Sequence, residues 1–256
     1  MQDVAGSGVS VARDAWMSGM LGVPSYCVKL ATDDGSACSL CAQDVQAALH
    51  PHMAGGMFAY VKVAPQAVGS IHALEGAGFR LVDTNVAFTR PAGAMLPLAG
   101  GDLNGIRFAR PASPDDAEAV AHVARTSFRY SRFHLDPAIP QAVACELKAV
   151  WAGNYFCGKR GDAMVVCEDA DGIAGFLQLL VTPEALVIDL IAVAERARRS
   201  GRASAMIAFA LHNMEPRAEM RVGTQVVNTA SMRLYEGLGF RVSGAQYVMH
   251  YHAEKE

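Results

Sequence analysis

The chain has little net charge and no long apolar run. Its 22 basic and 25 acidic residues leave a formal net charge of −3 over 256 residues, which provides no overall field to attract nucleic acid or an anionic membrane. No segment approaches the ~18 consecutive apolar residues of a membrane-spanning helix. The first residues include Asp3, Arg13 and Asp14 and lack a basic start followed by an apolar stretch, so we expect no signal peptide. Any anion site must therefore be local.

The sequence also lacks a second pair of zinc-type ligands and any sign of a disulfide framework. Its six cysteines occur in a long chain without an export signal, a context typical of reduced thiols in a cytoplasmic protein. Cys38 and Cys41 form a CxxC with His50 and His52 nearby, but HPH does not give the spacing that a second pair of structural zinc ligands usually has. We therefore expect buried thiols, no metal and a cytoplasmic location.

Apolar residues are abundant, at 52% against 18% charged ones. This balance is typical of a globular protein with a substantial core, in one large domain or two ordinary ones. The segment Pro91–Gly105 is dense in glycine and proline, which interrupt both helices and strands. It predicts one domain at 1–93, a linker at 94–104 and a second domain at 105–256.

A short pattern occurs twice, once in each of these parts. Ser70–Leu81 (SIHALEGAGFRL) and Ser231–Val242 (SMRLYEGLGFRV) agree at six of twelve positions, with a constant offset of 231 − 70 = 161. Identity at a fixed offset indicates a duplicated unit. The second copy has Tyr235 where the first has Leu74, so only the second carries an ionisable group there. We expect a working second part and a degenerate first part that supports it.

Apolar patterns and turn residues predict strands flanked by helices along both parts. This order indicates an α/β or α+β sheet domain. The expected helices cover 39–49, 65–76, 113–128, 140–151, 202–213 and 229–238, and the expected strands cover 57–63, 80–89, 105–110, 164–169, 173–181, 185–193, 220–226 and 245–251.

The most specific motif follows the expected strand at 185–193. Arg198, Gly201 and Ala203 fit an RxxGxA loop that runs into an amphipathic helix. Gly201 lets the backbone turn and approach a ligand closely, and the free N–H groups of the first helical turn favour an anion. Four arginines between 196 and 202 add local positive charge. The motif predicts a phosphate cradle; the alternative is an ordinary connection with a solvated arginine cluster.

A second element follows at Thr224–Phe240, where a strand end, Asn228, a short helix and Tyr235 succeed one another. In the order and spacing of the loop and this element, the chain resembles the GNAT superfamily of N-acetyltransferases. The segments TQVVNTA, SRF and AYVKVAPQAVGSIHALEGAGF make it most similar, within the superfamily, to the dTDP-fucosamine acetyltransferases. The resemblance implies the GNAT acyl-CoA N-acyltransferase fold, a mixed sheet flanked by helices, with a degenerate GNAT-like N-terminal half.

The resemblance also implies a site for acetyl-CoA and a catalytic group. Backbone amides from 199 to 203 would hold the CoA pyrophosphate, Val193 would bond the thioester arm, and Asn228 would contact the pantetheine. Tyr235 would donate a proton to the departing thiolate, which suits a phenol beside developing negative charge. Alternatively, Tyr235 is a core tyrosine with its hydroxyl tied to the backbone, and Asn228 caps the helix at Thr229. The implied cofactor-binding residues are Val193, Arg198, Arg199, Ser200, Gly201, Arg202, Ala203 and Asn228.

The segment FRYSRFHLDP at 128–137 gathers aromatic, cationic and histidine side chains in the loop that, by the resemblance, faces the acceptor. Arg132 suits a nucleotide diphosphate, Phe133 a sugar or base, and His134 or Asp136 hydroxyl groups. The alternative is a helix end with favourable cations and a proline stop. The expected substrate-binding residues are Arg132, Phe133, His134 and Gln225.

Asp189, in the strand VIDLIAV, is a candidate base for the acceptor amine, because a carboxylate in an apolar strand needs a partner or a role. By strand alternation it is expected on the same side as Val187, Ile191 and Val193. A structural hydrogen-bonding role is the alternative.

These patterns predict an acetyl-CoA-dependent N-acetyltransferase that acts on a nucleotide-linked 4-amino-4,6-dideoxy sugar by direct attack in a ternary complex. One alternative keeps the cofactor and changes the acceptor to a protein N-terminus, a polyamine or an amino acid. Another keeps CoA binding without turnover. The expected partners are small molecules, with no nucleic acid and no membrane, and a homodimer is one option for assembly.

Overall fold

The computed structural model describes residues 8–31, 40–91, 109–214 and 218–254. The expected linker at 94–104 lies outside these ranges. The chain forms two compact units: the first comprises Met1–Asn85, Leu135–Ala138 and Ala245–Glu256, and the second Val86–His134 and Ile139–Gly244. Within the described ranges, no helix has the length and apolar character needed to cross a membrane.

The first unit is built on a small mixed sheet with the strand order β1-β2-β3-β10-β4. The β1–β2 and β3–β10 pairs are antiparallel, and the β2–β3 pair is parallel. Helices α2 and α3 supply Val45, Leu49, Ala73 and Leu74 to its core. Its elements are β1 (Val9–Arg13), α1 (Ala15–Leu21), β2 (Ser25–Leu30), α2 (Ala42–Leu49), β3 (Met57–Val63), α3 (Val68–Gly76) and the parts of β4 (Arg80–Pro91) and β10 (Arg241–Ala253) that belong to it.

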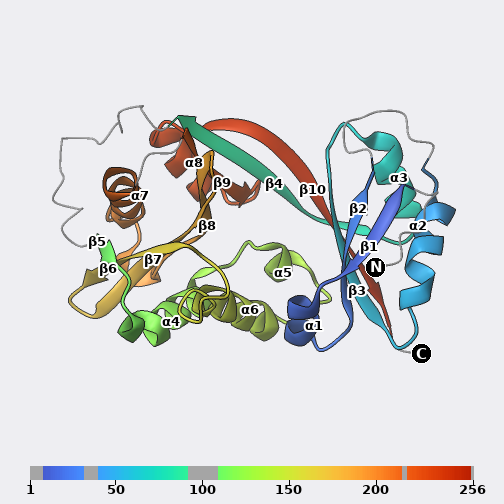
Figure 1. The fold of residues 1–256 in the computed structure, drawn as a ribbon, viewed down its shortest axis with the longest axis horizontal. Coiled ribbons are helices and arrows are strands. Elements are labelled where there is room, and N and C mark those ends of the chain that lie inside the picture. Colours follow the sequence, from blue (N-terminus) through green and yellow to red (C-terminus); the bar gives the residue numbers. More distant parts are fainter. Residues whose placement is uncertain (1–7, 32–39, 92–108, 215–217, 255–256) are drawn as a thin grey trace. The chain divides into compact units, whose positions relative to one another are not determined.

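The second unit contains a mixed sheet with the strand order β4-β9-β8-β7-β6-β5 (Figure 1). The β8–β9 pair is parallel, and the β5–β6, β6–β7 and β7–β8 pairs are antiparallel. Its elements are β5 (Ala109–Pro111), α4 (Ala117–Ser127), α5 (Arg132–Leu135), α6 (Gln141–Gly153), β6 (Ala163–Asp169), β7 (Gly172–Val181), β8 (Ala185–Val193), α7 (Arg202–Asn213), β9 (Glu219–Gln225) and α8 (Thr229–Gly237).

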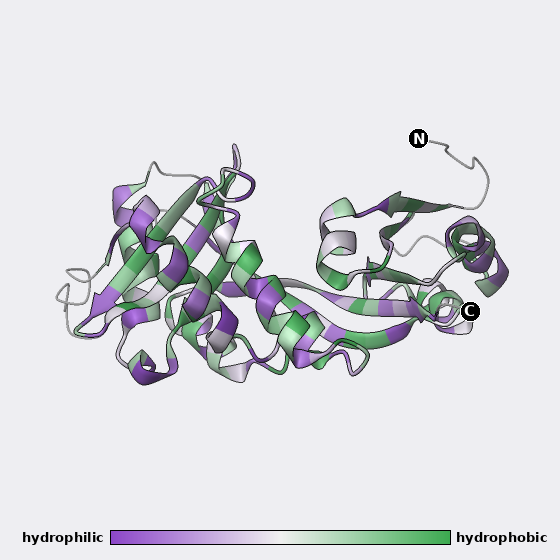
Figure 2. Ribbon diagram, turned by 90° about the horizontal axis from the view of Figure 1, so that it is seen from below, coloured by the Kyte–Doolittle hydropathy of each residue, from purple (hydrophilic) through white to green (hydrophobic). Residues whose placement is uncertain are grey.

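Two apolar clusters form the core of the second unit. The α7 cluster joins helices α7 and α8 to the sheet and includes Met206, Ile207, Tyr235 and Leu238. The α4 cluster joins α4 and α6 to the sheet and includes Val120, Val123, Ala124, Ala152 and Phe176. Figure 2 shows apolar and polar residues alternating along the helical ribbons, as expected for helices that bury one face.

The two copies of the repeated pattern adopt the same local structure. In each copy a helix, α3 or α8, ends before a glycine with positive φ, Gly78 at 104° or Gly239 at 83°, and a buried phenylalanine leads into a long strand. The amide of Phe79 donates to the carbonyl of Leu74 at 2.9 Å, and that of Phe240 donates to the carbonyl of Tyr235 at 3.0 Å. The local geometry therefore agrees with the duplication that the sequence predicts.

The compact units differ from the expected ranges 1–93 and 105–256, because each repeat strand passes from one unit into the other. Strand β4 begins in the first unit, and from Val86 onward it belongs to the second. Strand β10 makes the reverse passage after Gly244. In the second unit the buried Arg90 of β4 donates through Nε to the carbonyl of Leu238 at 2.9 Å. The end of the first repeat thus helps to fix the end of the second.

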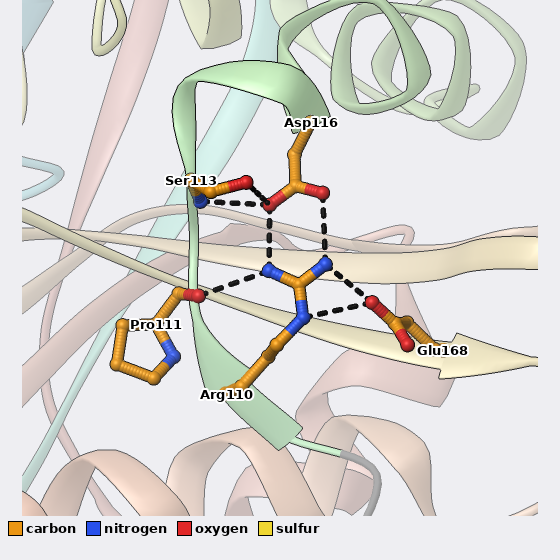
Figure 3. A network of polar contacts seen from close by, with 5 residues as sticks. All are labelled: Arg110, Pro111, Ser113, Asp116 and Glu168. Carbon is orange, nitrogen blue, oxygen red and sulfur yellow. Dashed lines mark hydrogen bonds and ion pairs between the residues drawn. The ribbon is translucent and has the colours of Figure 1, made fainter.

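One ion network fixes the entry of α4 (Figure 3). Arg110 on β5 donates to both carboxylate oxygens of Asp116, at 2.7 and 2.8 Å, and also bonds Glu168 on β6. The Asp116 carboxylate accepts from the backbone amide of Ser113 at 2.7 Å, which caps the turn before α4. Hydrogen bonds from Arg110 lower the pKa of Asp116 to about 2.

Candidate active site

The loop between β8 and α7 has the backbone of an anion cradle. After a short 3-10 helix at Glu195–Ala197, the chain takes left-handed conformations at Arg199 (φ 60°) and Gly201 (φ 77°). Gly201 is the N-cap of α7 and provides no side chain to cap it. A Cβ at Gly201 would meet nothing within 4 Å, so conformation rather than crowding requires glycine there. The first N–H groups of α7 thus have no side-chain cap, and a helix N-terminus of this kind favours an anion.

The arginines of this loop mainly hold its shape. Arg198 donates to the carbonyls of Val193 at 3.3 Å and Ser127 at 3.1 Å. Arg202 donates to the carbonyl of Glu168 at 2.9 Å, and Ser200 donates through its hydroxyl to Ala197 at 2.6 Å. We expected these guanidinium groups chiefly as local charge for a phosphate. The observed contacts show that Arg198 and Arg202 also hold backbone carbonyls around the loop.

Val193 ends β8 opposite Gly175 of β7 and packs against the α7 cluster. That cluster also contains Ala197 at the base of the loop, Met206 of α7 and Tyr235 of α8. The expected cofactor loop and the expected catalytic tyrosine therefore share one core.

Tyr235 is 2% exposed and is sandwiched between aromatic rings. Its ring centroid lies 5.8 Å from that of Phe88 and 5.7 Å from that of Phe240. Burial raises the pKa of its phenol above the ordinary value, so the group keeps its proton at neutral pH. We find no hydrogen-bond partner for its hydroxyl in the described part of the chain. Among the described residues the alternative of a hydroxyl tied to the backbone is not observed, and the role of Tyr235 as a proton donor stays a prediction.

Asn228 is the N-cap of α8, where its side-chain oxygen accepts from the amide of Ser231 at 3.2 Å. The capping role is confirmed, and a contact with a cofactor stays a prediction. Gln225 ends β9, and its carbonyl accepts from the amide of Asn228 at 2.9 Å. The two residues are thus held in one turn, next to Val226 and Val227, which are each 47% exposed.

The expected acceptor segment folds as α5, with only part of it at the surface. Phe133 is 1% exposed and His134 is 8% exposed, whereas Arg132 is half-buried with its guanidinium 4.5 Å from the Phe133 ring centroid. His134 Nδ1 lies 2.6 Å from the hydroxyl of Ser131, and Nε2 lies 3.7 Å from the thiol of Cys145. Burial, with Lys148 and Arg129 adding to it, lowers the pKa of His134 to about 4. These contacts favour structural roles for Phe133 and His134.

Asp136 belongs to the first unit rather than to the unit of His134. One of its oxygens lies 2.6 Å from Nδ1 of His250 and 2.8 Å from Nε2 of His252, and the other accepts from the amide of Ala138 at 2.9 Å. Burial alone would raise the pKa of Asp136, but the two histidines hold it below its ordinary value. The donor atoms of these three residues lie within 4.8 Å of one another, a spacing that could hold a metal ion. The direct hydrogen bonds already satisfy the carboxylate, and the expected lack of a metal stays a prediction.

The strand β8 is irregular at Asp189. Gln178 pairs with Leu190 and Leu179 pairs with Ile188, so Asp189 is an extra residue in the ladder. The bulge exchanges the two faces of the strand: Ile188 packs in the α7 cluster, and Leu190 packs in the α4 cluster. The expectation that Asp189 shares a side with Ile191 and Val193 is therefore wrong, because those two pack against the α7 cluster while Asp189 contacts Trp151 on the other face.

The Asp189 carboxylate is fully engaged. It accepts from Trp151 Nε1 at 2.9 Å, from Gln178 Nε2 at 3.0 Å, and from Arg160 Nε and Nη2 at 2.7 and 2.5 Å. Its side chain is 7% exposed. These hydrogen bonds occupy both carboxylate oxygens, so the observed contacts favour the structural alternative over a catalytic base.

Sequence reasoning missed three residues around this carboxylate: Lys148, Trp151 and Arg160. The side chain of Lys148 is buried beside Trp151, and Arg160 covers the same indole ring at 4.9 Å from its centroid. The signal was a lysine between Leu147 and Ala149 on the apolar side of a helix, where a solvated cation is not expected.

Comparisons with known proteins agree with this geometry. Residues 160–242 match the family model described as an acetyltransferase (GNAT) domain. The spore coat polysaccharide biosynthesis protein SpsD of Bacillus subtilis (strain 168) is 31% identical over 148 residues, which are 57% of this chain and 51% of that protein. The chain thus spans about half the length of this curated relative.

Solved structures share the fold at low sequence identity. A GCN5-related N-acetyltransferase from Sphaerobacter thermophilus matches with a TM-score of 0.65 and 14% identity, over 96% of this chain and 76% of that one. A tandem GNAT protein from the clavulanic acid biosynthesis pathway matches with a TM-score of 0.58 and 14% identity, over 92% of this chain and 77% of that one. These likenesses confirm the expected fold, a mixed sheet flanked by helices.

Proposed function

We propose that the protein, whose residues 160–242 match the model of an acetyltransferase (GNAT) domain, transfers an acetyl group from acetyl-CoA to the amino group of a nucleotide-linked amino sugar. The observation that carries the proposal is Tyr235, a buried phenol without a hydrogen-bond partner in the described residues, in the same core as the base of an uncapped helix N-terminus. This pairing supplies a proton donor and an anion cradle in one structure.

The loop fits the phosphates of acetyl-CoA. Arg199 and Gly201 are left-handed, and a Cβ at Gly201 would meet nothing within 4 Å, which supports a phosphate beside the amides up to Ala203. Arg198 fixes the loop to the end of β8 at Val193. Acetyl-CoA, when bound, supplies a thioester whose carbonyl carbon the acceptor amine attacks.

Tyr235 then acts on the leaving sulfur. As the carbon–sulfur bond breaks, the thiolate takes the phenolic proton, and the ammonium formed by attack loses its proton to water. Water then returns a proton to the Tyr235 phenolate. Burial raises the pKa of Tyr235, so the phenol carries its proton when negative charge develops on the sulfur, although the same burial makes the phenol a weaker acid. The apolar walls from Phe88 and Phe240 strengthen its hydrogen bond to the thiolate. Asp189 is not assigned as the base because its oxygens are already engaged.

The choice of acceptor rests on two points. SpsD is named for polysaccharide biosynthesis, which supports a sugar substrate. Arg132 is half-buried near other cations, which suits an anionic nucleotide. The free thiols among the described cysteines fit a cytoplasmic enzyme, and that location belongs to the proposal.

The first unit is proposed to be a degenerate GNAT-like partner. Leu74 replaces the tyrosine at the matching helix position and is fully buried, so it can only pack. The name of the tandem GNAT structure supports such an arrangement, since that protein has a similar fold.

The test is CoA thiol release by the purified full chain with acetyl-CoA and a panel of nucleotide-linked 4-amino-4,6-dideoxy sugars, polyamines, amino acids and peptides, with products weighed by mass spectrometry. Release only with a sugar nucleotide, with a product heavier by one acetyl group, is the expected result. Release only with another amine would refute the acceptor, and CoA binding without any release would refute the transferase.

Tyr235→Phe tests the proton donor. We expect kcat to fall by roughly 100-fold with CoA affinity retained, because general acid catalysis contributes about 10²–10⁴-fold. Tyr155→Phe is the matched control, since Tyr155 is a half-buried tyrosine that packs on Phe156 at 5.1 Å away from the α7 cluster. Full turnover by Tyr235→Phe at every pH would remove Tyr235 from the mechanism.

A further inference from the structure

Two histidines and an aspartate of the first unit bring three metal-binding atoms together. Nδ1 of His250 and Nε2 of His252 lie 2.6 and 2.8 Å from one oxygen of Asp136, and all three donor atoms lie within 4.8 Å of one another. The three residues belong to the same compact unit, although Asp136 is distant from the histidines in sequence. Imidazole nitrogen and carboxylate oxygen are both ligands that zinc takes in proteins.

The two histidines project from a paired strand. They are two residues apart on β10, so their side chains leave the same face of the strand. His250 pairs with Tyr60 of β3 and His252 pairs with Phe58, in a register that runs unbroken from Tyr247 to Ala253. The buried ring of Phe58 packs against both imidazoles, with centroids at 4.8 and 5.1 Å. This frame fixes the separation of the two imidazoles, as a binding site on a rigid element requires.

The carboxylate brings the negative charge that a divalent cation needs. The side chain of Asp136 is 4% exposed and that of His250 is 1% exposed. The two histidines hold the pKa of Asp136 below its ordinary value, so the group is ionised at neutral pH. Its other oxygen accepts from the amide of Ala138 at 2.9 Å, an outer contact of the kind that orients a metal-bound carboxylate. The side chain of His252 is 35% exposed, so an ion can enter from that side.

The hydrogen bonds and a bound ion are alternative uses of the same three atoms. Without an ion, each ring nitrogen must carry the hydrogen that it donates to Asp136. Zinc takes the lone pair of those nitrogens instead, so each ring hydrogen moves to the other nitrogen or leaves as a proton. Tetrahedral ligands about 2.0–2.1 Å from zinc lie about 3.3 Å apart. The two nitrogen–oxygen separations would therefore widen by about 0.5–0.7 Å, which small side-chain rotations supply.

We propose that Asp136, His250 and His252 bind one zinc ion. The site does not depend on the transferase reaction or on its acceptor. The expectation of no metal came from the CxxC at 38–41 and the HPH at 50–52, and this site uses other residues.

The role of the ion is structural. Segment Leu135–Ala138 belongs to the first unit, whereas the chain on both sides of it belongs to the second. This segment overlaps the expected acceptor segment at 128–137, and Asp136 is the residue through which it bonds β10. A zinc ion would replace two hydrogen bonds by three metal–ligand bonds, so it anchors the segment to β10 more firmly.

The test is zinc binding to the untagged full chain after chelator treatment, measured by titration calorimetry, with Co²⁺ as a spectroscopic probe. We expect one ion per chain and a Co²⁺ spectrum of nitrogen and oxygen ligands, without a thiolate band. His252→Gln should weaken zinc binding at least ~100-fold, since loss of even an outer-shell partner of a ligand typically costs about 10–100-fold. His72→Gln is the matched control, an exposed histidine on α3 of the same unit, and should bind zinc like wild type.

His252→Cys separates a lost ligand from a lost fold. Because a thiolate is also a zinc ligand, this variant should keep its zinc, and its Co²⁺ complex should gain a thiolate band that wild type lacks. Equal zinc affinity in wild type and His252→Gln would overturn the inference, as would a wild type that binds no zinc. A thiolate band in wild type would assign the ion to cysteines and would also overturn it. A denaturation curve shows whether each variant is folded, and if His252→Gln is not, the thiolate band of His252→Cys decides.

Discussion

Removing the charge of Lys148 should stabilise the second unit. The folded-state pKa of about 8 lies below the ordinary 10.5. Below pH 8 the lysine is charged in both states, and the folded state carries the whole penalty, at most 2.5 × ~1.4, or about 3.5 kcal/mol. Lys148→Met also gives up the cation contacts with Phe128 and Trp151, worth about 2 kcal/mol for a desolvated cation. We therefore expect the variant to be about 1.5 kcal/mol more stable at pH 7.

The pH dependence gives the sharper test. Between pH 8 and 10.5 the folded wild type loses the proton of Lys148 before the unfolded chain does, so wild-type stability rises relative to the variant and the gap closes. Urea unfolding followed by the fluorescence of Trp151, in a Trp16→Phe background, reports on the second unit alone. Lys159→Met is the control and should show no such trend.

Two results would refute the reasoning. A Lys148→Met variant that is as stable as wild type or less stable at pH 7 would mean that the ammonium is well compensated in the fold. A stability gap that stays constant from pH 7 to 10 would mean that Lys148 does not titrate in that range.

Three further predictions concern the scaffold of the site. Gly201→Ala should lower CoA affinity roughly tenfold in titration calorimetry, because a φ of 77° costs an alanine about 1–2 kcal/mol. Gly172, with a φ of 98°, lies in a hairpin outside the loop, so Gly172→Ala should strain the fold without lowering CoA affinity. Gly175→Ala should destabilise the second unit by about 1–3 kcal/mol in urea unfolding, because its Cβ would lie 2.8 Å from the carbonyl oxygen of Ala192. A Cβ at Gly153 would meet nothing within 4 Å, so Gly153→Ala should not destabilise the unit in this way. Equal stability of the two variants would contradict the reasoning. Because the pKa of His134 is lowered to about 4, the free energy of unfolding of the wild type should fall by about 2 kcal/mol relative to that of His134→Gln as the pH drops from 6.5 to 4. If the two free energies of unfolding changed in parallel with pH, the titration of His134 would not contribute to acid stability.

Much of the fold could be predicted because the apolar patterns of the larger elements are long and regular. Met57–Val63, Ala185–Val193 and Arg202–Asn213 have the same bounds in the sequence prediction and in the structure. The elements β1, α1 and β2 were not expected. They are only five to seven residues long, and over that length a local pattern says little until tertiary pairing selects it.

The candidate site was predicted where backbone conformation has a residue signature. Gly201 indicated a left-handed turn and Asn228 indicated a helix cap, and both are observed. The left-handed Arg199 had no such signature. The face of Asp189 was mistaken because alternation holds only in an unbroken ladder, and the bulge depends on pairing with β7. Lys148 was overlooked because the groups that surround it, such as Phe128 and Asp189, are distant in sequence.

Because β10 passes from the second unit into the first, the sheet of the first unit can be completed only after the end of the chain has been synthesised. Strand β3 pairs with Tyr247–Ala253, which are among the last residues to be synthesised. During translation, the edge of β3 that will pair with β10 therefore has no partner strand. A fragment that ends at the glycine-rich segment lacks β10, so this edge of β3 stays unpaired. Such an edge can recruit a strand from another chain. Production of either half alone should yield aggregates or exchanged dimers, whereas completion of the full chain closes the edge from within.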